Sequence, residues 1–80
     1  MLTRIRNYIL DEEFKINVFQ NKINIKNYKD INHFDDKRIE VLFEKGNVEI
    51  SGNELVIEKL LDDEILISGL INKIEFKNAK

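Results

Sequence analysis

Apolar and polar residues alternate with a period of two between Gly46 and Phe76. Successive side chains of a β-strand point to opposite faces, so this alternation predicts strands that place one face on a core. A helix over residues 55–66 is the alternative interpretation, but the many β-branched residues and an internal repeat favour strands. The apolar positions are Val48, Ile50, Leu55, Ile57, Ile65, Ile67, Ile71, Ile74 and Phe76.

This region repeats itself with an offset of 17 residues. Ile50-Ser51-Gly52 recurs as Ile67-Ser68-Gly69, and Ile57-Glu58 recurs as Ile74-Glu75. Glycine adopts the backbone conformations that tight turns require. Each unit therefore predicts a strand, a reversal at its glycine and a return strand, and the two resulting hairpins would share one apolar face.

Two further hairpins are predicted from the same alternation. Apolar alternation over residues 14–25 is interrupted by a polar reversal at 20–22, which is typical of a hairpin. Residues 39–50 show the same pattern around a reversal at 44–46, where Gly46 is the turn residue.

The connections between these hairpins follow a less regular pattern. Residues 28–34 are expected to form an irregular link. Asp35 and Asp36 then predict an acidic turn, because an aspartate carboxylate can accept a hydrogen bond from the backbone amide two residues on. Leu60 and Leu61 interrupt the alternation, which predicts a corner where the chain passes from one sheet layer to another.

The chain is expected to contain one domain. Apolar residues at helical spacing predict a short amphipathic N-terminal helix or arm over residues 1–13. Residues 14–77 are expected to form a single all-β domain, followed by a tail at 78–80. The predicted fold is a small antiparallel β-sandwich or β-roll, a meander of about six to eight short strands.

Composition limits how so small a domain can be stabilised. A chain of 80 residues buries only about 60% of the surface of its unfolded form, so its core is thin. The absence of cysteine and the presence of a single histidine leave neither a disulfide nor a typical zinc site as a staple. Burial against a partner or against a second copy of the chain is the means of stabilisation that remains. The net charge of −2 predicts no strong attraction to nucleic acid or an anionic membrane. A cytosolic location is expected, because no secretion signal is apparent.

No set of residues in the sequence points to catalysis, and neither a cofactor nor a metal is expected. Ser51 and Ser68 occupy equivalent positions before glycines, which indicates a structural requirement rather than two nucleophiles. His33 lies without evident companions for acid–base or metal chemistry. The carboxylates at 35–36 and 62–64 lack the alternate-position spacing of a calcium loop and are interpreted as solvated turns.

One segment has an uneven charge distribution, because four lysines occur there without an acidic residue. Lysines interleaved with aromatic residues can bind single-stranded nucleic acid through phosphate contacts and base stacking. Lysines also protect an edge strand from pairing, and this interpretation, an edge or partner surface, is the favoured one. The residues concerned are Lys15, Lys22, Lys26 and Lys29, with the aromatic residues Phe19 and Tyr28.

Residues 23–77 resemble the YabP/YqfC family of sporulation proteins. The resemblance rests on the spacing of glycines and aliphatic residues, at Gly46, Val48, Ile50, Gly52, Leu55 and Ile57, and again at Ile65, Ile67, Gly69, Ile71, Ile74 and Phe76. The sequence HFDD at 33–36 is more similar to the YabP side of the family.

The resemblance implies a function in spore formation. It implies a small protein of the mother cell of an endospore-forming bacterium, needed for forespore maturation and with no known enzymatic activity or cofactor. It would act by protein–protein interaction, as a homo-oligomer or with a sporulation membrane protein, in the cytoplasm or at the forespore membrane.

Overall fold

The computed structural model describes residues 13–78, and all regular secondary structure in this range is β. The predicted N-terminal helix over residues 1–13 lies, but for Glu13, outside the described residues. The strands are β1 (Lys15–Val18), β2 (Lys22–Lys26), β3 (Asp30–Phe34), β4 (Arg38–Phe43), β5 (Gly46–Leu60) and β6 (Glu64–Asn78).

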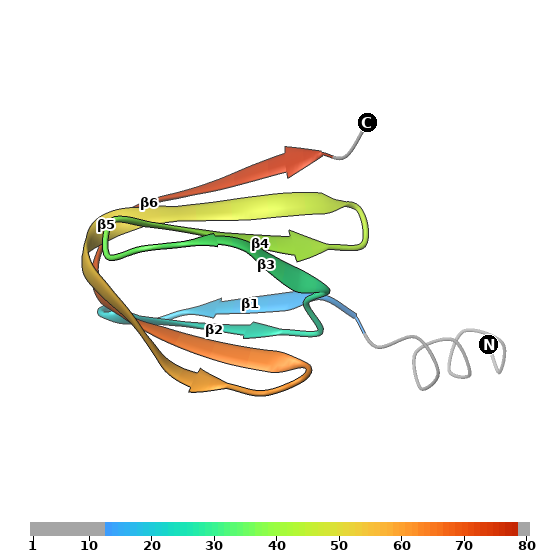
Figure 1. The fold of residues 1–80 in the computed structure, drawn as a ribbon, viewed down its shortest axis with the longest axis horizontal. Helices are drawn as coiled ribbons and strands as arrows, with labels where there is room; N and C mark the ends of the chain where they lie inside the picture. Colours follow the sequence, from blue (N-terminus) through green and yellow to red (C-terminus); the bar gives the residue numbers. More distant parts are fainter. Residues whose placement is uncertain (1–12, 79–80) are drawn as a thin grey trace, which may run out of the picture.

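The strands form one antiparallel sheet of six strands in the order β1-β2-β6-β5-β4-β3 (Figure 1). The all-β prediction is confirmed. The predicted meander describes only β3 to β6, because the β1–β2 hairpin joins the free side of β6 instead of pairing with β3. The strands are also not uniformly short, since β5 and β6 are 15 residues each.

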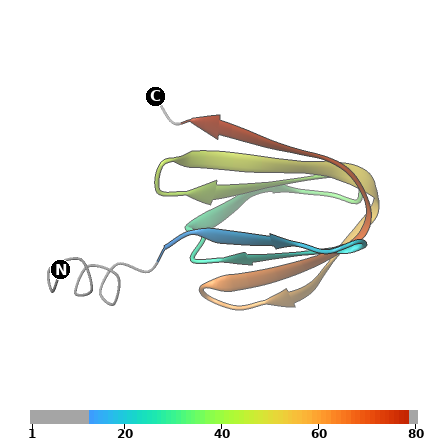
Figure 2. The same cartoon turned by 180° about the vertical axis from the view of Figure 1, so that it is seen from behind.

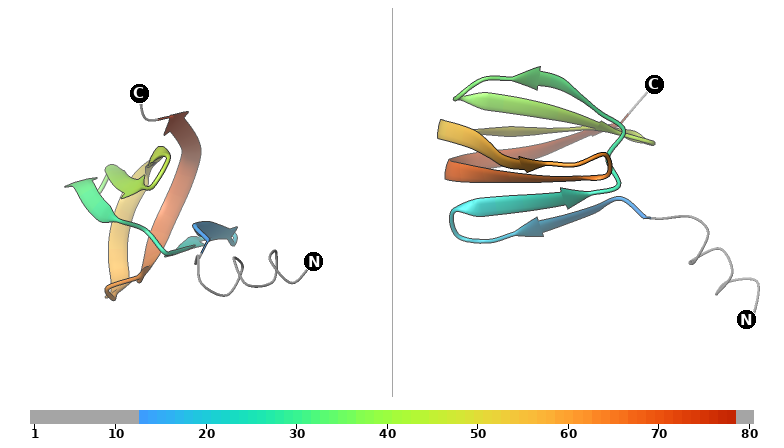
Figure 3. Two further views of the ribbon diagram at one scale, coloured as in Figure 1. Left: turned by 90° about the vertical axis from the view of Figure 1, so that its right-hand side faces the viewer. Right: turned by 60° about the horizontal axis from the view of Figure 1, so that its bottom comes forward.

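The sheet folds over on itself because β5 and β6 both bend sharply (Figures 1 and 2). We call one side of the bend the β4 half: β3, β4, residues 46–51 of β5 and residues 73–78 of β6. The β2 half contains β1, β2, residues 64–68 of β6 and residues 56–60 of β5. Figure 3 shows that the two halves face each other with the bend at one end.

The 17-residue repeat relates the two halves. Ile50 of β5 pairs with Ile74 of β6, and the equivalent pair is Ile67 with Ile57. Strand β4 lies beside β5 in one half as β2 lies beside β6 in the other. The backbone N–H of Gly52 donates to the Lys37 carbonyl (3.0 Å), and that of Gly69 donates to the Asn21 carbonyl (3.1 Å). The repeat therefore reflects an approximate two-fold symmetry between the two halves of the sheet.

The predicted chain reversals at Gly52 and Gly69 are wrong, because both strands continue through their glycines. The glycines are required by the bend instead. A Cβ atom on Gly52 would lie 2.0 Å from the carbonyl oxygen of Leu70. Gly69 has a φ of 134°, and a Cβ there would lie 2.6 Å from the Glu54 carbonyl oxygen. Only glycine lets the two backbones approach this closely.

The core lies between the two halves and is entirely aliphatic, as the alternation predicts. Nine apolar side chains of the described residues are buried in it: Ile23, Ile25, Ile39, Val41, Val48, Ile50, Leu55, Ile65 and Ile67. At the open end, opposite the bend, the Phe14 ring stacks on Phe43 with centroids 4.0 Å apart, and Phe43 meets Phe76 edge-on at 6.4 Å. Phe14 precedes β1 whereas Phe43 belongs to β4, so this aromatic contact joins the two halves.

Two connections differ from their predictions. The expected irregular link at 28–34 contains strand β3, in which a bulge between Ile31 and His33 breaks the alternation. The expected corner at Leu60 and Leu61 is the tip of the β5–β6 hairpin, whose turn spans 61–63. The corner between layers lies at the two glycines. The hairpins around 20–22 and 44–46 are confirmed.

Candidate interaction surface

The acidic turn between β3 and β4 is built around Asp35, as predicted. Its Oδ1 atom accepts hydrogen bonds from the backbone N–H groups of Lys37 (2.8 Å) and Arg38 (2.7 Å). Its Oδ2 atom lies 2.8 Å from Nε2 of His33. These contacts, the hydrogen bond with His33 first, lower the pKa of Asp35 from 3.8 to about 2. The side chain of Asp36 is exposed, and its carbonyl accepts from Leu55 N–H at 2.8 Å.

We expect the turn around Asp35 to contribute to the loss of stability of the fold in acid. Because the Asp35 pKa is lower in the folded state, the ionised carboxylate stabilises the fold above pH 4 or so, and this contribution disappears as pH falls towards about 2. We expect Asp35→Asn to be less stable near neutral pH and to lose part of the acid-dependent fall in urea midpoint. Asp36→Asn is the matched control. Parallel curves for wild type and Asp35→Asn between about pH 5 and pH 2 would contradict this assignment.

The residues considered for chemistry do not form an enclosed site. The His33 and Asp35 side chains are in contact but remain 36% and 50% exposed. Ser51 and Ser68 both lie at the bend, in different strands. Within residues 13–78 no group of three or more histidine, cysteine, aspartate or glutamate side chains could hold a metal ion. The turn at 61–63 exposes Asp62 and Asp63 to solvent, whereas the half-buried Glu64 at the start of β6 accepts a hydrogen bond from Asn24 Nδ2 at 2.8 Å.

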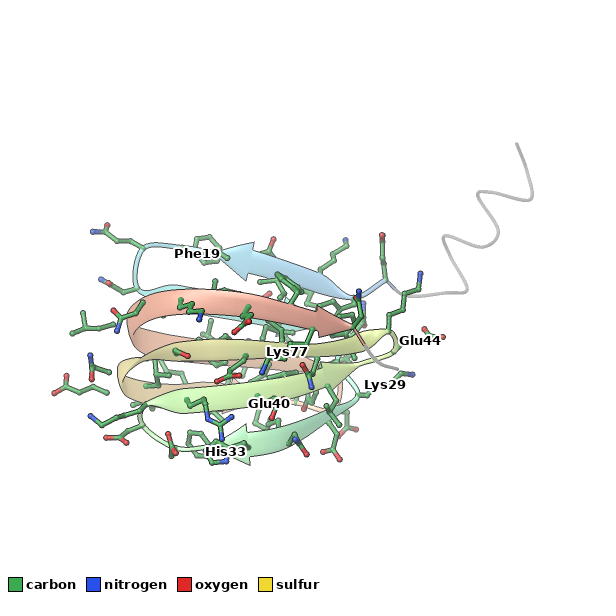
Figure 4. All side chains as sticks on the ribbon, turned by 90° about the horizontal axis from the view of Figure 1, so that it is seen from above. Phe19, Lys29, His33, Glu40, Glu44 and Lys77 are labelled. Atoms are coloured by element: carbon green, nitrogen blue, oxygen red, sulfur yellow. The ribbon has the colours of Figure 1, made fainter. Side chains whose placement is uncertain are left out.

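The predicted lysines and aromatic residues do not form a single group, although the backbone N–H of Phe19 donates to the Lys22 carbonyl at 2.8 Å. Lys15 pairs with Lys26 across β1 and β2, and Lys22 lies on the same outer face of the β2 half. Lys22 Nζ lies 3.5 Å from the carboxylate of Glu58. Figure 4 shows Lys29 and Phe19 towards opposite ends of the molecule. Phe19 belongs to the β1–β2 turn, where it is 59% exposed.

Tyr28 is occupied by a structural contact. Its hydroxyl donates a hydrogen bond to the Leu61 carbonyl, which ties the β2–β3 link to the tip of the β5–β6 hairpin. Partial burial, together with the nearby carboxylates of Asp62, Asp30 and Asp63, raises the pKa of this hydroxyl. Tyr28 is therefore held at the hairpin tip, and Phe19, next to Lys22, is the one aromatic residue of the predicted set that stays largely exposed.

Alternating charges cover the outer face of the β4 half (Figure 4). Glu49 on β5 accepts a hydrogen bond from Lys77 Nζ on β6 at 2.9 Å and lies 3.6 Å from an Arg38 nitrogen on β4. The hydrogen bond from Lys77 lowers the pKa of Glu49, and the same contact raises the pKa of Lys77. Lys73 and Glu75 form a second pair on β6, 3.6 Å apart.

Residues 73–78, which we call the β6 edge, form a margin of the sheet that the sequence pattern alone could not identify. This segment pairs with β5 on one side. Ile74 and Phe76 point inwards, opposite the buried Ile50 and Val48. Phe76 nevertheless remains 59% exposed, because it lies at the margin of the core. Within the described residues, the backbone groups of the β6 edge are therefore unpaired on one side. The same segment carries an apolar inner row, Ile74 and Phe76.

Other large apolar side chains are also exposed at the margins of the fold. They are Val18, Phe19, Phe34, Val56, Leu60, Leu61 and Leu70, each between 47% and 59% exposed. Single exposed apolar residues are normal on a protein surface. Those that lie along an unpaired strand offer a binding partner both apolar surface and backbone hydrogen bonds.

Comparison with models of protein families identifies the family of this chain. The model of the YabP family matches residues 12–80, which cover all six strands. A search among curated proteins finds no match. Residues 13–78 contain no helix that is long and apolar enough to span a membrane. Since the family model covers all of the described residues and most of the chain, the chain belongs to the YabP family.

Proposed function

We propose that this protein acts in sporulation by binding other protein chains and not by catalysis. Membership of the YabP family, whose name implies sporulation, is the observation that carries the proposal. The second support is geometric, because exposed apolar residues at the sheet margins, such as Phe76 and Leu60, provide surface for a protein partner.

The proposed place of action is the mother cell, in the cytoplasm or at the forespore membrane, during maturation of the forespore and its envelope. The partners would be further copies of the chain or a membrane protein specific to sporulation. No cofactor is assigned. Binding of single-stranded nucleic acid through the lysines of residues 15–29 is the alternative. It is less favoured because Tyr28 is tied to the Leu61 carbonyl and Lys29 lies towards the opposite end from Phe19.

Deletion of the gene in its source organism tests this proposal. We expect the deletion strain to grow normally but to lose most of its heat-resistant spores, because forespore maturation would fail. A copy of the wild-type gene at another locus should restore the spore count. A deletion strain with a normal spore count, or one that also fails in vegetative growth, would contradict a role specific to sporulation.

A further inference from the structure

The margins of the sheet differ in how well they could accept another strand. Strand β1 has only four residues, and β3 has a bulge between Ile31 and His33. The last part of β5 has another bulge, between Ile57 and Lys59. Short or bulged edges hinder pairing with other chains. The β6 edge instead pairs with residues 46–51 at six successive positions without a shift, and it forms the upper margin in Figure 1.

The 17-residue repeat allows the bulged margin of β5 to be compared directly with the regular β6 edge. Ile57-Glu58 of β5 and Ile74-Glu75 of β6 are equivalent positions on the two margins. At Glu58 the β5 margin has an extra residue that interrupts its pairing with β6, and the Glu58 carboxylate faces Lys22. At Glu75 the pairing is regular. The β5 margin is thus interrupted by a bulge, whereas the β6 edge keeps the regular geometry with which another strand can pair.

The side chains of the β6 edge are complementary to themselves in antiparallel pairing. The outer row reads Lys73, Glu75, Lys77, and the inner row contains Ile74 and Phe76. Directly opposed residues of two antiparallel strands point to the same face, so inner residues must lie opposite inner residues. Two identical strands meet this condition only when one residue lies opposite the same residue of the second copy, because a slip by one position would place inner residues opposite outer ones. Centring on Glu75 would place Lys73 opposite Lys77 and Glu75 opposite itself, which like-charge repulsion disfavours.

Two registers remain, and the exposure of Phe76 distinguishes them. Centring on Phe76 places Glu75 opposite Lys77 of the second copy twice, and it covers both half-exposed Phe76 rings. Centring on Ile74 places Phe76 opposite Asn72, where the pairing of β6 with β5 is already shifted. Both registers pair opposite charges, Glu75 with Lys77 in the first and Lys73 with Glu75 in the second, so the larger apolar surface that the first buries decides between them.

We propose that two copies of this chain pair antiparallel through their β6 edges, with Phe76 opposite Phe76 of the second copy. The pairing joins the two β4 halves into one continuous sheet and puts two Glu75–Lys77 pairs across the junction. This inference rests on the proposed function and deepens it, because it names the partner and the surface that binds it.

Cross-linking of single-cysteine variants tests the register, since the chain has no cysteine of its own. Directly opposed Cβ atoms in an antiparallel pair lie about 4.5 to 5.5 Å apart, close enough for a disulfide to form with small adjustments. We expect the full chain with Phe76→Cys to form a covalent dimer under mild oxidation, and the chain with Glu75→Cys to form little. Preferential cross-linking of Ile74→Cys would overturn the register.

Sedimentation tests the dimer without removing Phe76. The wild-type chain should sediment at twice its mass of 9.5 kDa. Glu75→Lys should sediment as a monomer, because lysine would face Lys77 of the second copy, and Glu75→Lys with Lys77→Glu should restore the dimer. Lys59→Glu on the bulged margin is the matched control, and circular dichroism confirms folding of each variant. A monomeric wild type would overturn this inference, whereas the spore count of the deletion strain tests the proposed function independently.

Discussion

Replacing Gly52 with alanine is expected to lower the free energy of unfolding strongly. The added Cβ atom would lie 2.0 Å from the carbonyl oxygen of Leu70, a backbone atom on the neighbouring strand. Relieving that overlap requires β5 and β6 to separate at the bend, where the two halves of the sheet are joined. We expect a loss of about 3 kcal/mol or more. A chain of 80 residues has a total stability of roughly 4 to 12 kcal/mol.

Urea unfolding of the full-length variant, followed by circular dichroism, measures this effect. Gly46→Ala is the matched control, because the φ of Gly46 lies outside the left-handed region. Alanine there is expected to change the free energy of unfolding by less than about 1 kcal/mol. An unfolding midpoint for Gly52→Ala close to that of the wild type would show that the backbones do not approach each other as closely as described.

Alternation predicted most of the strands and the core. In 14–25 and 39–50 it placed the fully buried Ile23 and Ile39 on the inner face, although Val18 at the end of β1 is 57% exposed. The reason is that a strand with one buried face must place an apolar residue at every second position. The hairpin turns followed from the polar residues that interrupt this pattern.

The pattern failed where an extra residue enters a strand. Ile31 and Phe34 are three positions apart, so β3 does not alternate, although its bulge lets both face the core side. At Gly52 the pairing shifts in the same way. In the sequence a glycine that permits a bend looks the same as a glycine in a turn, because both need the missing side chain. The contact with Leu70 is visible only in three dimensions.

The candidate site was predictable only in its local parts. Asp35 was identified as a turn residue because its hydrogen bonds join residues close in sequence. The β6 edge was not, because its character depends on which strands lie beside it. Nothing in the sequence of 73–78 indicates that this segment pairs with another strand, β5, on one side alone, since edge and central strands can have the same alternation. The bulge at Glu58 likewise follows from pairing across the sheet.

A charge reversal at the β6 edge is expected to abolish function while leaving the fold intact. Glu75 is exposed on the outer face and contacts Lys73 of its own strand. Exposed ion pairs contribute about 0 to 1 kcal/mol to stability, so Glu75→Lys should fold. At the proposed junction, however, the new lysine would meet Lys77 of the second copy in two places.

The central claim is that this YabP family protein supports sporulation through pairing of its β6 edges. The most direct test is the count of heat-resistant spores in strains whose only copy of the gene carries Glu75→Lys, Lys59→Glu, or Glu75→Lys with Lys77→Glu. Immunoblots should show equal amounts of each protein. We predict few heat-resistant spores with Glu75→Lys, and normal counts with Lys59→Glu and with the double variant. A normal count with Glu75→Lys would contradict the account.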